Sequence, residues 1–124
     1  DHTPTGNMPA PELKGIAPHQ GPVMVTIEYK IESEQLGDFI DVMRDIRLIR
    51  LRDGAFFWNL FNDVENLHRF LECFMVESWL EHMRQHERFS VSDRHFLDHL
   101  AALHRGAHPP KVEHFVASEL LNSP

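Results

Sequence analysis

Histidine pairs at helical spacing are the first residues of this sequence whose types and positions suggest chemistry. His82 and His86 lie four residues apart, and His95 and His99 repeat that spacing further along the chain. Two imidazoles on one helical face are a common beginning of a zinc or iron site. A divalent site needs a third ligand, however, and the neighbouring carboxylates are equally well explained as solvated helix surface. We therefore interpret the histidines as structural and predict no metal site.

The two tryptophans are the residues best suited to shape a ligand cavity. Trp58 lies in a predicted strand and Trp79 at the start of a predicted helix. A buried indole N–H needs an acceptor, and we expect Asn59, Asn62 or a histidine to provide it. Two core tryptophans are the simpler interpretation, and a small-ligand pocket is the alternative. The candidate pocket residues are Trp58, Trp79, His82 and His86.

No residue has the surroundings of an activated nucleophile. No serine stands in a Gly-x-Ser-x-Gly turn, and no phosphate-binding glycine motif is present. Cys73 is the only cysteine, so an intramolecular disulfide is excluded. It lies within an apolar strand and away from any helix N-terminus that would favour a thiolate. We predict no catalytic residue, no cofactor and a reducing compartment.

The charge of the chain argues against nucleic acid as a partner. The formal net charge is −7, whereas DNA-binding domains carry a basic face. The densest basic cluster lies in one predicted helix, where we expect it to complement the helix dipole near the C-terminus. Its members are Arg44, Arg47, Arg50 and Arg52. No uncharged stretch approaches the roughly 18–20 residues that span a bilayer.

The elements that must position these residues follow from hydrophobic periodicity. Residues 1–22 hold five of the eight prolines and predict a semi-extended linker. Alternation of apolar residues predicts a strand over 23–31. Ser33 is then a candidate N-cap for a helix that runs to about Leu51 and ends at Asp53-Gly54.

The second half of the chain predicts four further elements. Two strands, 55–62 and 69–77, flank a polar turn at 63–66. A short helix follows over 78–88, with Trp79, Leu80 and Met83 directed inward. Ser90 is a candidate N-cap for another helix, which Gly106 would end, before a last strand over 112–117. Residues 120–124 are assigned to a C-terminal tail.

This order predicts an α+β fold of the ferredoxin-like β-α-β-β-α-α-β kind over residues 23–119. The two middle strands are apolar on both faces, although helices can cover only one face of such a sheet. A second copy of the same sheet is the simplest cover for the other face. We therefore expect a homodimer with the architecture of a dimeric α+β barrel.

Four segments resemble one protein family. They are Gly21–Tyr29, Arg52–Ala55, Val76–Arg88, and the pair formed by Ser92-Asp93-Arg94 and Leu103-His104. Together they resemble the C-terminal soluble domain of major facilitator superfamily transporters of the transmembrane secretion effector group. The segment Val76–Arg88 is the most specific of the four, and the similarity covers nearly all of residues 21–116.

The resemblance implies a cytoplasmic appendage of an exporter, with a fold similar to antibiotic biosynthesis monooxygenases. It supplies no catalytic residue. The chain begins at Asp1, so we expect a soluble piece of a longer membrane protein on the cytoplasmic side of the cell membrane. The expected partners are a second copy, the rest of the transporter and a small-molecule ligand.

Two hypotheses for function follow. The preferred one is a non-enzymatic module for dimerisation or ligand sensing. The alternative is a cofactor-independent or haem-handling monooxygenase of the dimeric α+β barrel type, which rests on fold analogy.

Overall fold

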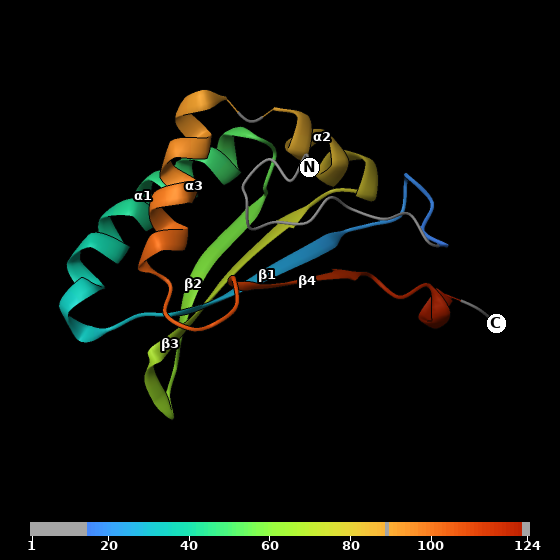
Figure 1. Ribbon diagram of the computed structural model, residues 1–124. Coiled ribbons are helices and arrows are strands. Elements are labelled where there is room, and N and C mark those ends of the chain that lie inside the picture. Colours follow the sequence, from blue (N-terminus) through green and yellow to red (C-terminus); the bar gives the residue numbers. More distant parts are fainter. Residues whose placement is uncertain (1–14, 89, 123–124) are drawn as a thin grey trace.

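Three helices lie on one face of a four-stranded antiparallel sheet (Figure 1). The computed structural model describes residues 15–88 and 90–122. The strands are β1 (Val23–Lys30), β2 (Phe57–Asp63), β3 (Asn66–Val76) and β4 (Lys111–Val116). The helices are α1 (Leu36–Arg52), α2 (Trp79–Glu87) and α3 (Val91–Leu103). Because the spatial order is β2-β3-β1-β4, the predicted ferredoxin-like α+β fold is confirmed.

Most helices and strands begin and end within a few residues of the positions predicted from the sequence. Gly54 follows α1 with a φ of 111°, a conformation that favours glycine, as predicted for the end of this helix. Ser90 caps α3 in a reciprocal capping box with Asp93. The N-cap prediction for Ser33 is wrong. Ser33 begins a short 3-10 turn, Ser33–Gln35, and no side chain caps α1 behind it.

Strand β3 begins three residues earlier than expected. The turn between β2 and β3 needs only Val64 and Glu65, because the Asp63 side chain accepts a 2.8 Å hydrogen bond from the Glu65 amide. The C-terminal end of α3 also differs from the prediction, since the helix ends at Leu103, before Gly106. Leu80, expected to face inward, is 37% exposed.

The core lies between the sheet and the helices. Alternate residues of β1 and β3 face the helices, and α1 and α3 contribute apolar stripes with helical spacing. Its most completely buried side chains include Val23, Val25, Ile31, Phe39, Met43, Ile46, Phe74, Val76 and Leu100.

Residues 15–22 run against the domain, although the sequence predicted a linker there. The amides of Trp79 and Leu80 donate to the carbonyls of Gln20 and Pro18, both at 2.8 Å. A side chain at position 21 would place its Cβ 2.0 Å from the carbonyl oxygen of Glu77, so only glycine fits. The rest of the predicted linker, residues 1–14, lies outside the described residues.

Within the described part of the chain, no helix combines the length and the apolar character needed to cross a bilayer.

One carboxylate, Glu72 of β3, is buried completely on the helix-facing side of the sheet. Arg50 of α1 donates to it through Nε at 2.9 Å and Nη2 at 3.4 Å, and its guanidinium lies 4.7 Å from the centre of the Phe74 ring. The Tyr29 hydroxyl and the Trp58 indole N–H each donate to the same carboxylate at 2.9 Å. Burial and the adjacent Glu72 charge raise the pKa of Tyr29 well above its usual value, so its hydroxyl remains a donor.

Removing this charge should destabilise the fold. We expect Glu72→Gln to lower the free energy of unfolding by about 3 kcal/mol, because it leaves the Arg50 guanidinium buried without a counter-charge. Urea unfolding followed by far-UV circular dichroism measures the difference. The control is Glu65→Gln, which changes an exposed carboxylate in the turn between β2 and β3. An equal loss of unfolding free energy in the two variants would contradict the role of the buried Glu72 charge in stability.

Candidate functional site

The predicted pocket residues do not form one site. Trp79 and His82 lie together, with ring centres 5.4 Å apart, and His114 of β4 completes the cluster at 5.9 Å and 4.8 Å from them. Trp58 lies on β2, and β2 and β4 are opposite edges of the sheet. Three strand spacings, about 14 Å, therefore separate Trp58 from His114. His86 belongs to α2, but its side chain is not among the described ones.

Trp58 has a different hydrogen-bond partner from the one expected. Its indole N–H donates to Glu72, so the prediction of Asn59, Asn62 or a histidine is wrong. The ring lines a shallow cavity of about 170 Å³ between α1 and β2, together with Ile40, Met43 and Leu60. The signal for Glu72 was present in the sequence, because period-2 alternation in β3 places this carboxylate on the same face as Phe70 and Phe74.

His114 is the member of the aromatic cluster that the sequence analysis missed. It alternates with Val112 and Val116 along β4 and therefore faces the core, a pattern that could have identified it. Desolvation lowers the pKa of His114. A neutral imidazole packed against Trp79 and His82 stabilises the junction of α2 with the sheet.

The second histidine pair lies on the solvent side of α3. His95 and His99 line a groove with three aspartates of α1, Asp38, Asp41 and Asp45. Across residues 15–88 and 90–122, no group of three or more His, Cys, Asp or Glu side chains is arranged to hold a metal ion.

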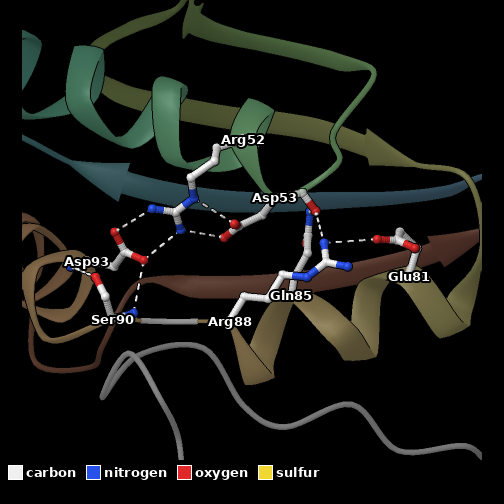
Figure 2. Close-up of polar contacts among 7 residues, drawn as sticks. All are labelled: Arg52, Asp53, Glu81, Gln85, Arg88, Ser90 and Asp93. Atoms are coloured by element: carbon white, nitrogen blue, oxygen red, sulfur yellow. Dashed lines mark hydrogen bonds and ion pairs between the residues drawn. The ribbon is translucent and has the colours of Figure 1, made fainter.

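Residues from three of the four segments that resemble the family form a polar network with Ser90 between the helices (Figure 2). Arg52, in the last turn of α1, donates to both oxygens of Asp53 at 2.9 and 3.0 Å. It also donates to both oxygens of Asp93 on α3 at 3.2 and 2.7 Å. Since Asp93 also completes the capping box with Ser90, one guanidinium joins the end of α1 to the start of α3.

Helix α2 is held by the same junction. The backbone oxygen of Asp53 accepts from Gln85 Nε2 at 3.3 Å and from Arg88 Nη1 at 3.0 Å (Figure 2). Arg88 also forms a 3.0 Å ion pair with Glu81. These motif residues are thus explained by the packing of three helix ends. Three of the four clustered arginines have carboxylate partners beyond the helix dipole. Arg50 and Arg52 pair with carboxylates that are themselves buried, whereas Arg44 forms an exposed pair with Asp41 at 3.1 Å.

The face of the sheet opposite the helices carries an apolar row across all four strands. Cross-strand pairing aligns Phe57 of β2, Met75 of β3, Met24 of β1 and Phe115 of β4. Phe57 is 38% exposed and Phe115 46% exposed, and Phe61 on the same face is 46% exposed. The helices all lie on the other side (Figure 1). We call the aligned residues Phe57, Met75, Met24 and Phe115 the outer apolar row.

Comparison with models of known families identifies the family of this chain. A family model described as transmembrane secretion effector matches residues 1–121. The chain belongs to this family. The result agrees with the resemblance seen in the motifs. No curated protein matches this sequence.

Solved structures show how common the fold is. A candidate antibiotic biosynthesis monooxygenase from Caulobacter crescentus is 16% identical, with a TM-score of 0.67 over 82% of this chain and 94% of that one. A candidate enzyme of the same description from Bordetella bronchiseptica is 20% identical, with a TM-score of 0.63 over 77% and 96%. A conserved protein from Methanosarcina mazei is 13% identical, with a TM-score of 0.64 over 75% and 89%. At these identities the likeness extends to the fold alone.

The Arg52–Asp93 contact should make stability depend on pH. Hydrogen bonds from Arg52 lower the pKa of Asp93 below its usual 3.8, so the folded protein favours the ionised carboxylate. The resulting stabilisation is present above about pH 4 and is lost as the pH falls through the folded-state pKa. We expect Asp93→Asn to lower the free energy of unfolding by about 1 kcal/mol at pH 7, since Arg52 is half exposed.

Urea unfolding at a series of pH values measures this effect. The difference between wild type and Asp93→Asn should shrink below about pH 4. The control, Asp98→Asn, changes an exposed aspartate of the same helix. A constant difference at all pH values would contradict the role of the Asp93 charge.

Proposed function

We propose that this chain is the cytoplasmic C-terminal domain of a major facilitator superfamily exporter and that it joins two copies through their sheets. The outer apolar row is the observation that supports pairing. Membership of the transmembrane secretion effector family supports the exporter context.

A second copy would cover this face favourably, because the apolar area that it buries can offset the cost of association and two-fold symmetry matches the two faces. The exposed parts of Phe57, Phe61 and Phe115 amount to about 500 Å² over two copies, given the usual size of a phenylalanine side chain. Burying this area would contribute on the order of 13 kcal/mol, against an association cost of roughly 4–15 kcal/mol. Met24 and Met75 add to the favourable side. Under two-fold symmetry one row supplies both halves of the interface.

The packed segment 15–22 is consistent with a domain attached to a larger protein. The backbone of Pro18 and Gln20 satisfies the first amides of α2, and the carbonyl of Pro22 accepts from the amide of Ala117 at 3.0 Å. A preceding part of the protein would therefore be joined to the domain at a fixed position, because segment 15–22 is packed against it.

Charges placed in the outer apolar row should separate the two copies. We expect the wild-type chain to sediment as a dimer at about 20 µM and the variant Phe57→Glu/Phe115→Glu as a monomer, because charged side chains are strongly disfavoured inside an apolar interface. Analytical ultracentrifugation measures the change.

The matched control is Leu48→Glu, which changes a side chain that is 60% exposed on α1, away from the sheet. It should remain dimeric. Far-UV circular dichroism confirms that all three proteins are folded. A monomeric wild type, or a dimeric double variant, would refute pairing through this face.

The exporter context has its own test. We expect the reading frame that encodes this chain to encode several apolar segments of roughly 20 residues each, as transmembrane helices require. Sequencing of the complete reading frame decides the matter, and a frame without such segments would exclude an exporter.

A further inference from the structure

An open cleft beside the α3–β4 loop gathers cations in a chain that is acidic overall. The cleft has a volume of about 420 Å³ and lies between the end of β1, the loop after α3 and the start of β4. Lys30, Arg105 and Lys111 contribute to its walls. The whole sequence contains three lysines, so two of them line this single cleft.

The two lysines share the outer face of the sheet. Glu28 of β1 pairs directly with Lys111 of β4, so Lys30, two residues along β1, lies diagonally across from Lys111 on the same face. Such diagonal neighbours are about 7–8 Å apart, and like charges at this range are unfavourable. Glu28, which also lines the cleft, lies directly opposite Lys111 and two residues from Lys30 on this face, and its charge, which Arg69 pairs as well, offsets part of the repulsion. A bound anion would offset the rest.

The carboxylates nearby are already paired. Arg69 forms an ion pair with Glu28 and lowers the pKa of that carboxyl, and Arg105 pairs with Glu32. The nearest carboxylate to Lys111 is Glu113, at 3.8 Å between exposed groups, a contact that contributes little to stability. Within the described part of the chain, the Lys30 ammonium has no carboxylate within 4.0 Å.

The cleft is held in shape without these ammonium groups. The backbone amide of Lys30 donates to His104 Nδ1 at 3.1 Å, and the amide of Arg105 donates to the Lys30 carbonyl at 2.7 Å. His104 Nδ1 accepts, so Nε2 carries the ring proton and donates to the His108 carbonyl at 3.1 Å. These bonds fix the loop to the end of β1 and leave both lysine side chains available to a ligand.

We propose that this cleft binds a small soluble ligand that carries a phosphate group, held by Lys30, Lys111 and Arg105. The two ammonium groups match the charge of a phosphate. The guanidinium of Arg105, whose own charge Glu32 balances, adds N–H donors for the acceptor oxygens of the phosphate. The cleft is larger than a phosphate, which leaves room for an organic part of the ligand.

The lysines share the outer face of the sheet with the outer apolar row but lie toward the other end of the strands. Lys30 is six residues from Met24 along β1 and Lys111 is four residues from Phe115 along β4, which places them about 20 Å and about 13 Å from that row. The sedimentation of the apolar variants and the titration of the cleft test the two proposals by separate measurements.

Calorimetric titration with pyrophosphate at low salt tests the site. We expect Lys30→Gln/Lys111→Gln to bind pyrophosphate at least tenfold more weakly than wild type, because it removes two charge-assisted contacts. The control variant, Arg44→Gln/Arg94→Gln, removes two exposed positive charges from the helices and should stay within about twofold of wild type.

A second measurement does not depend on the variants. In two-dimensional amide NMR spectra of wild type, pyrophosphate should shift the signals of residues near Lys30, Arg105 and Lys111. The proposal is overturned if wild type does not bind pyrophosphate at millimolar concentration, or if both double variants lose affinity equally. Binding to phosphatidylglycerol vesicles without binding to pyrophosphate would also overturn it and would indicate a membrane surface as the partner.

Discussion

The buried ion pair between Glu72 and Arg50 is the constraint on which the arrangement of sheet and helices depends. A fully buried carboxylate is tolerated only when its oxygens are hydrogen-bonded and its charge is matched. Here the donors come from β1, β2 and α1, so satisfying one side chain of β3 fixes the position of three other elements. The ring of Trp58 is held by the same bond, which makes it part of the core.

The last turn of α1, which carries both Arg50 and Arg52, extends this constraint to the other helices. Arg50 points into the core, whereas Arg52 lies over Asp53 and Asp93 at the start of α3 (Figure 2). The backbone carbonyl of Asp53 accepts hydrogen bonds from the side chains of Gln85 and Arg88, and these bonds attach α2 to the end of α1. Packing of the helix ends therefore explains most of the residues that carry the family resemblance. We expect other molecules to bind at surfaces outside that network.

Two such surfaces lie at opposite ends of the strands. The outer apolar row occupies the end of the sheet near α2, and the cationic cleft occupies the end near the α3–β4 loop. The apolar end suits a second sheet, and the charged end suits a dissolved anion. A domain with this division can pair two copies and still present a ligand site to solvent.

The sequence by itself determined the elements and the fold class, since periodicity, capping by Ser90 and the turn at Gly54 are local properties. It also predicted an apolar second face for the sheet. It could not decide which side chains meet, because cross-strand register and the docking of α2 bring together residues far apart in the chain. Tertiary structure alone separated Trp58 from Trp79, added His114 to the aromatic cluster, and placed Lys30 beside Lys111.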